Sequence, residues 1–193
     1  MKKYIYLIRH GESQWNVEHR FQGNTPHAPG LTEKGRQDIL ALKKKLPAVD
    51  HIYTSPATRT RESAALFANG APVTELAELR ERAYGPLDGM LRDDAQKKFP
   101  SALKAYEAPR ELPGIAGAES TELMGRRGLK ALEFIAHSTG QRFAVFTHGA
   151  VIRSVAALVE KKPYMKMGKV ENSGWVVVEY DTEKNIFKLA LGG

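Results

Sequence analysis

Near the start of the chain stands Tyr4-Ile5-Tyr6-Leu7-Ile8-Arg9-His10-Gly11, an apolar run that ends in an arginine, a histidine and a glycine. A continuous apolar run this short is typical of a strand buried on both faces of a sheet. A second apolar run, residues 143–146, is followed in the same way by His148-Gly149. Ligands of open α/β sheets bind beyond the carboxyl ends of the strands. We therefore expect His10 and His148 to lie at one sheet edge, each with a helix starting just after its glycine.

Strand and helix patterns alternate along most of the chain. Ser55 and Pro56 have the residue types of an N-cap and a first helical position, so we expect a helix to start there. The irregular segment at about 80–118 is rich in glycine, proline and charge and predicts a small helical insertion over the active-site edge. The alternation predicts one domain, residues 1–193, folded as a three-layer α/β/α sandwich with a mostly parallel central sheet. The remaining expected elements are strands at 51–54 and 73–76, helices at 37–46, 120–137 and 150–159, and a hairpin of 175–180 with 186–191.

Composition excludes several classes of protein. The chain has 193 residues with Lys+Arg 29 and Asp+Glu 22, a net charge of +7, and no cysteine. It therefore has no disulfide, no thiolate metal site and no thiol nucleophile. Apolar runs are too short for a membrane span or a secretory signal, so we expect a cytoplasmic protein without a membrane partner. The basic residues are not gathered among aromatic ones, which argues against a nucleic-acid partner, whereas the positive charge suits an anionic ligand.

Two arginines belong to the same expected site as the two histidines. Arg9 immediately precedes His10, and Arg59 lies on the helix that follows the second strand. Side chains on a helix lean toward its N-terminus, so Arg59 can reach back over the sheet edge. Guanidinium groups pair with the oxygens of a phosphate, which a lysine cannot do in the same way. Two arginines and two histidines that converge would bind a doubly charged oxyanion.

Further motifs stand in a fixed order around these four residues. The first is Leu7-Ile8-Arg9-His10-Gly11-Glu12-Ser13 with Trp15-Asn16. The others are Phe21-Gln22-Gly23, Leu31-Thr32-Glu33-Lys34-Gly35, Thr54-Ser55-Pro56 with Arg59, Glu81 with Gly85, Asp88 and Gly89, Ala118-Glu119-Ser120 with Arg127, and Phe146-Thr147-His148-Gly149 with Ile152-Arg153. This ordered set covers nearly the whole chain and resembles the histidine phosphatase superfamily, the phosphoglycerate-mutase-like proteins.

The resemblance implies a reaction that proceeds through a phosphohistidine. His10 would be the nucleophile, because a neutral imidazole attacks phosphorus without a metal. Arg9, Arg59 and a partly protonated His148 would hold the transferring phosphoryl group. Glu81 would protonate the leaving alkoxide and then take a proton from water, a role that needs a raised pKa. The resemblance implies no metal and no cofactor, and it adds as substrate- or phosphate-binding residues Asn16, Gln22, Gly23, Gly149, Tyr84 and Arg92.

The resemblance leaves two activities open, and we favour the phosphatase. The loop at 81–85 resembles that of the mutases, and Arg92 stands where mutases have a substrate-binding lysine. Both features favour a cofactor-dependent phosphoglycerate mutase. Ala150, which stands where mutases have asparagine, and the short chain favour a metal-independent phosphatase that acts on small phosphorylated metabolites. A non-catalytic binder of phosphorylated ligands is a second alternative, but no expected catalytic residue is absent. A metallohydrolase is disfavoured because the histidines and carboxylates lack ligand spacing. We expect a monomer or a homodimer.

Overall fold

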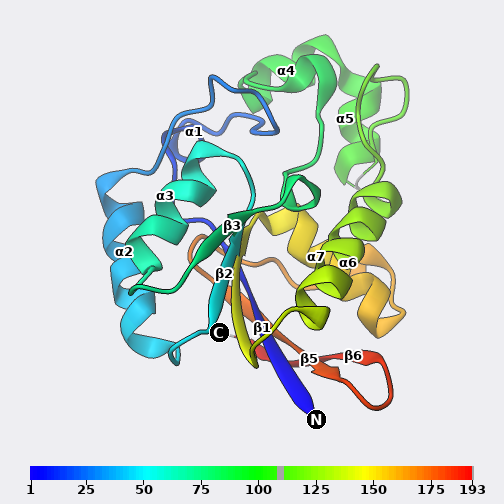
Figure 1. Cartoon of the computed structure of the whole chain (residues 1–193). Coiled ribbons are helices and arrows are strands. Elements are labelled where there is room, and N and C mark those ends of the chain that lie inside the picture. Colours follow the sequence, from blue (N-terminus) through cyan, green and yellow to red (C-terminus); the bar gives the residue numbers. More distant parts are fainter. Residues whose placement is uncertain (108–110, 193) are drawn as a thin grey trace.

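A computed structural model describes residues 1–107 and 111–192 and contains a six-stranded sheet (Figure 1). The strands lie in the order β3-β2-β4-β1-β5-β6. The first four in this order are parallel, and β5 and β6 form an antiparallel hairpin beside β1. The predicted α/β fold with a mostly parallel sheet is confirmed. The strands are β1 (Lys2–Arg9), β2 (His51–Thr54), β3 (Val73–Glu75), β4 (Arg142–Thr147), β5 (Trp175–Asp181) and β6 (Ile186–Gly192).

Helices cover both faces of the sheet. On one face lie α2 (Glu33–Lys45) and α3 (Thr58–Phe67), and on the other lie α6 (Thr121–His137) and α7 (Gly149–Glu160) (Figure 1). Alternate side chains of a strand point to opposite faces. In β4, accordingly, Phe143 and Val145 join the core beneath α6 and α7, whereas Ala144 and Phe146 join the core beneath α2 and α3.

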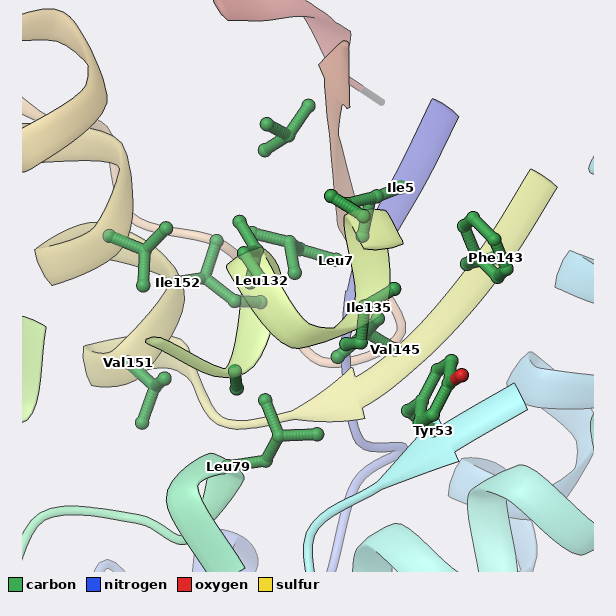
Figure 2. Packing of buried hydrophobic residues seen from close by; sticks show 14 of the residues in the cluster. Ile5, Leu7, Tyr53, Leu79, Leu132, Ile135, Phe143, Val145, Val151 and Ile152 are labelled. Atoms are coloured by element: carbon green, nitrogen blue, oxygen red, sulfur yellow. The ribbon is translucent and has the colours of Figure 1, made fainter. Parts of the chain in front are cut away.

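The larger core packs α6 and α7 against the middle of the sheet. Figure 2 shows Leu132, Ile135 and Ile152 from these helices against Ile5 and Leu7 of β1. All five side chains are almost completely buried. Burial stabilises the folded state by about 1.5–3 kcal/mol for each fully buried side chain of this kind. The strands β1 and β4, which end just before the two histidines, are therefore held firmly in the core.

Two helix starts differ from the sequence-based expectation. Helix α3 begins at Thr58 and has no side-chain cap, because its N-cap residue is Ala57. The hydroxyl of Ser55 accepts from the backbone N–H of Ala57 and lies 2.8 Å from His148 Nε2. After His10-Gly11 the chain continues to Ser13, which precedes a single turn, α1 (Gln14–Val17). Only the second histidine therefore has a helix directly after its glycine, since α7 begins at Gly149.

The insertion lies above the carboxyl ends of the parallel strands (Figure 1). It has a hydrophobic core of its own, in which Phe21 packs with Tyr84, Leu87, Leu103 and Tyr106. Where the structure describes the chain, no helix is long and apolar enough to pass through a bilayer. The short elements of the insertion and its surroundings are η1 (Ala77–Leu79), η2 (Gly85–Leu87), α4 (Arg92–Lys98), α5 (Pro100–Glu107) and, before β5, η3 (Tyr164–Lys166).

Candidate active site

Two histidines and one arginine from distant parts of the chain meet at the sheet edge. The imidazole rings of His10 and His148 have centroids 5.4 Å apart at an angle of 62°. Arg59 joins them, with Nε 3.2 Å from His10 Nε2 and Nη2 2.9 Å from His148 Nδ1. All three side chains are buried. The convergence expected for these residues is present.

The hydrogen bonds of His10 fix its tautomer. Its Nδ1 lies 2.7 Å from the carbonyl oxygen of Gly11, which can only accept, so Nδ1 carries the hydrogen. Its Nε2 therefore has the free lone pair and accepts from Arg59. Burial, and then the positive charges of Arg59 and Arg9, hold the pKa of His10 well below its ordinary value. At neutral pH this imidazole is uncharged and can attack through Nε2.

Both ring nitrogens of His148 are engaged in a different way. Because Nδ1 accepts from Arg59, Nε2 carries the hydrogen and donates to the hydroxyl of Ser55 at 2.8 Å. Burial, followed by the positive charge of Arg59, lowers the pKa of His148 well below its ordinary value. The contacts of His148 in this structure therefore leave it one ring proton, and the partly protonated ring expected while it holds a phosphoryl group stays a prediction.

Two guanidinium groups, the buried one of Arg59 and the half-buried one of Arg9, supply the positive charge of the site. Arg59 also donates to the carbonyl oxygens of Gln22 and Gly23, and burial lowers its pKa to about 10, so it stays protonated at neutral pH. Arg9 donates to Val170 O at 2.9 Å, and burial lowers its pKa as well. A Cβ on Gly149 would lie 3.3 Å from Arg9 Cδ. The glycine thus lets Arg9 lie across the start of α7.

Glu81 belongs to the loop that leads into the insertion. Its side chain is 8% exposed and lines the same cavity as Arg9 and His10. Burial raises the pKa of Glu81 in spite of a 2.8 Å hydrogen bond from the backbone N–H of Arg82 and the nearby positive charges. A carboxyl with a raised pKa keeps a proton that it can donate.

A cavity of about 550 Å³ opens from these groups toward the insertion. Besides Arg9, His10 and Glu81, its lining contains a tryptophan, three tyrosines and several cationic side chains. No group of three or more histidine or acidic side chains within residues 1–107 and 111–192 is arranged to hold a metal ion. The cavity suits a small, anionic and polar ligand.

The family follows from comparison with known proteins. Residues 5–190 match the family model of the histidine phosphatase superfamily (branch 1). The chain belongs to this superfamily. It is 31% identical over 190 residues to a metal-independent phosphoserine phosphatase of Arabidopsis thaliana, covering 93% of this chain and 77% of that protein. It is also 31% identical over 173 residues to a 2,3-bisphosphoglycerate-dependent phosphoglycerate mutase of Rhodopseudomonas palustris, covering 81% of each. Among solved structures, YhfR of Bacillus stearothermophilus superposes with a TM-score of 0.88 at 31% identity, covering 97% of this chain and 95% of that one.

Most of the expected binding residues of this histidine phosphatase superfamily member line the cavity: Asn16, Gln22, Gly149, Tyr84 and Arg92. Among these, Gln22 has an Nε2 that is buried without a partner, which suits a donor awaiting an oxyanion. Arg92 stacks on Phe21, with its guanidinium carbon 4.6 Å from the ring centre. The hydroxyl of Tyr84 lies 3.3 Å from that of Tyr106.

Gly23 differs from the other expected residues in its position. It is not part of the cavity lining, and its backbone N–H donates to Asp88 at 2.7 Å. A Cβ at this position would lie 2.8 Å from both Asp88 Oδ2 and Arg82 O. Gly23 contributes its carbonyl oxygen to the site, which accepts a hydrogen bond from Arg59. Because Gly23 has no Cβ, Arg82 and Asp88 of the insertion can lie close to it.

Sequence reasoning did not predict the turn at 170–174, which contacts both Arg9 and His10 at the end of β1. Asn172 Nδ2 lies 3.1 Å from His10 O and 3.0 Å from Asn16 Oδ1. The N–H of Ser173 donates to His10 O, and Gly174 O accepts from Arg9 N–H. These contacts join residues that are distant in the chain, and a polar turn before a strand has no local pattern that would reveal them.

Proposed function

We propose that this chain is a metal-independent phosphomonoesterase that acts through a phosphohistidine at His10 Nε2. The observation that carries the proposal is the neutral imidazole of His10, whose lone pair at Nε2 is held beside a permanently charged guanidinium. A nucleophile and a cation on the same side of a small cavity are what phosphoryl transfer needs, since its catalysis is mainly positioning and charge stabilisation.

The first step forms a bond from His10 Nε2 to phosphorus while the bond from phosphorus to the ester oxygen breaks. Arg59 turns from His10 Nε2 to the phosphoryl oxygens and, together with Arg9, offsets their charge. Glu81 gives its proton to the leaving alkoxide. The raised pKa of Glu81 supports this role, because its carboxyl stays protonated at a higher pH than an exposed one.

The second step returns the enzyme to its starting state. A water molecule attacks phosphorus, Glu81 takes a proton from that water, and the bond from phosphorus to His10 Nε2 breaks. Inorganic phosphate is released and the neutral imidazole is restored. The buried Nε2 of Gln22 and the N-terminus of α7 at Gly149 supply further hydrogen-bond donors for the phosphoryl oxygens.

The substrates are small phosphorylated metabolites, which the volume and charge of the cavity admit. Support for hydrolysis comes from the phosphoserine phosphatase relative, which matches a larger share of this chain than the mutase does. The second candidate is a phosphoglycerate mutase, favoured by the several mutases among the relatives. Chain length does not separate the two, because this chain spans 81% of the Rhodopseudomonas mutase.

A metal-free assay with two substrates tests the proposal. The purified protein is incubated in EDTA with p-nitrophenyl phosphate and, separately, with 3-phosphoglycerate, and both free phosphate and phosphoglycerate isomers are measured. We expect phosphate from both substrates and no effect of EDTA. Isomerisation without release of phosphate would show a mutase. Loss of activity in EDTA would contradict the metal-independent mechanism, and tight phosphate binding without turnover would show a binder.

A further inference from the structure

Arg127 of α6 lies behind the loop of Glu81 and uses every N–H of its guanidinium group. Nε lies 2.7 Å from Glu119 Oε1 and Nη2 lies 2.8 Å from Glu119 Oε2, so the two side chains form a two-point ion pair. Their side chains are 11% and 13% exposed. An ion pair with parallel hydrogen bonds and little solvent has a fixed geometry, unlike a mobile surface pair.

The other N–H groups of Arg127 donate to the backbone of the Glu81 loop. Nη1 lies 2.7 Å from Glu78 O and 2.6 Å from Arg80 O, and Nη2 lies 3.1 Å from Glu81 O. One guanidinium therefore binds three carbonyl groups within four residues. These bonds fix the path of the backbone up to Glu81 itself.

Glu119 holds the same loop on the far side of Glu81. Its carboxylate accepts from the N–H of Ala83 at 3.4 Å, and its backbone carbonyl accepts from Arg82 Nε at 2.6 Å. Helix α6 is itself packed into the larger core through Leu132 and other apolar side chains. The loop is thus tied on both sides of Glu81 to a helix that rests on the sheet.

We propose that Arg127 and Glu119 are positioning residues that hold the backbone at 78–83 so that the carboxyl group of Glu81 stays in the cavity, within reach of the leaving group. This inference rests on the proposed phosphatase activity. Neither Arg127 nor Glu119 lines the cavity, so they act through Glu81 and not on the substrate. A lysine would keep the charge of Arg127 but could not bind Glu119 and three carbonyls in one plane.

The neighbouring Arg126 provides a matched control. It has the same charge and lies on the same helix, but its side chain is 70% exposed and pairs with Glu122, one turn away. The test compares Arg127→Lys with Arg126→Lys by kcat/KM for two substrates. One is p-nitrophenyl phosphate, whose leaving group needs little protonation, and the other is a simple alkyl phosphate, whose leaving group needs a proton from Glu81.

We expect Arg127→Lys to lower kcat/KM for the alkyl phosphate at least about tenfold more than for p-nitrophenyl phosphate, since a general acid contributes about 10²–10⁴-fold. Arg126→Lys should change neither value. Glu119→Gln, which keeps the size of the side chain, should show the same selectivity to a smaller degree. Equal losses with both substrates would show only a loss of folded enzyme and would overturn the inference.

A double variant separates positioning from other effects. In a Glu81→Gln background, Arg127→Lys should cause no additional loss with the alkyl phosphate, because the group that it positions is already disabled. Losses that multiply would contradict the proposal.

Hydrogen exchange tests, without relying on activity, whether Arg127 and Glu119 hold the backbone at 78–83. The backbone amides of residues 78–83 should exchange at least about tenfold faster in Arg127→Lys and at the same rate in Arg126→Lys. Unchanged exchange would refute a positioning role even in an active enzyme. If the unaltered chain turned over neither substrate but the exchange rates changed as expected, the proposed function would be wrong. The role of Arg127 in holding the backbone at 78–83 would still be supported.

Discussion

The two His-Gly turns of this protein share a sequence pattern but differ in structure. Both follow a buried strand, and both place an imidazole against Arg59. At His148 a twelve-residue helix starts at once, and each ring nitrogen is engaged by a side chain. At His10 the chain runs on to Ser13 before a single turn, and one ring nitrogen is held by the adjacent carbonyl.

The difference shows how hydrogen-bond partners divide the work between two similar residues. An acceptor at Nδ1 leaves His10 with a lone pair at Nε2, which suits a nucleophile. A donor at Nδ1 and an acceptor at Nε2 place the lone pair of His148 at Nδ1 and its hydrogen at Nε2, toward Ser55, which suits a supporting group. The partners of each ring are therefore more informative about its role than the Arg-His-Gly or Thr-His-Gly pattern around it.

The sharpest way to break the comparison is to remove each imidazole in turn. His10→Ala should lower kcat/KM for p-nitrophenyl phosphate by at least about 10³-fold, as for the loss of a nucleophile, and abolish labelling of the protein by a radioactive phosphate ester. The exposed His27→Ala is the control and should retain both properties. A labelled, active His10→Ala enzyme would show that the nucleophile lies elsewhere.

His148→Ala should have a smaller effect of about 10²-fold, because it removes the acceptor that orients Arg59 and lets this guanidinium shift from its place. Radioactive phosphate should still be found on the protein, because His10 is retained. Peptide mapping of the labelled variant measures this directly. A loss as complete as that of His10→Ala, together with no label, would mean that the two rings act as one nucleophilic unit.

Acid should destabilise the fold between pH 7 and pH 5. Both buried histidines have pKa values far below the ordinary value of about 6.5 that applies to the unfolded chain. Below that value the unfolded chain binds two protons that the folded chain does not, so the free energy of unfolding falls by up to about 1.4 kcal/mol per histidine and pH unit.

Glu81 acts with the opposite sign wherever the pH lies between its unfolded pKa and its raised folded pKa. Its raised folded pKa means that, at a pH between its unfolded and folded values, the folded chain holds one proton more than the unfolded chain, which offsets one of the two histidines. Urea unfolding at pH 7, 6 and 5 measures the sum. The free energy of unfolding of His148→Asn should depend less steeply on pH than that of the unaltered chain. The His27→Asn variant should behave like the unaltered chain. Equal slopes in all three proteins would mean that His148 is not neutral when folded.

Ser55→Ala should have the smallest effect, about fivefold on kcat/KM, which corresponds to one hydrogen bond of about 1 kcal/mol. The substitution removes the acceptor that holds His148 Nε2. The exposed Ser101→Ala is a control of the same chemistry and should leave the rate unchanged. An equally active Ser55→Ala enzyme would show that Arg59 alone orients His148.

The strands that carry the site are predictable from the sequence because a strand buried on both faces has an unbroken apolar pattern. Residues 4–8 and 143–146 have this pattern, and the structure contains both strands in adjacent, parallel positions. The start of α3 is not predictable in this way. Ser55 has the residue type of a cap, but the helix begins at Thr58 with Ala57 at the cap position, and the hydroxyl of Ser55 also bonds to the distant His148.

The residues of the candidate site also fall into a group that the sequence predicts and a group that it does not. Arg9, His10, Arg59 and His148 follow from motifs at strand and helix ends, whereas Asn172 and Ser173 reach His10 through backbone contacts between segments more than 150 residues apart. The charge state of His148 is also not predictable from the sequence, because it depends on burial beside Arg59. Contacts of this kind exist only after folding.

The separate hydrophobic core of the insertion has a consequence for how such a protein can diversify. Phe21, Leu87 and Leu103 pack among themselves, whereas the nucleophile rests on side chains of the central sheet. Substitutions in the insertion can therefore remodel the outer wall of the cavity while the sheet edge keeps its shape. Changes in the apolar core of the insertion would alter which small anions fit the cavity and would leave the arrangement of His10, Arg59 and His148 as it is.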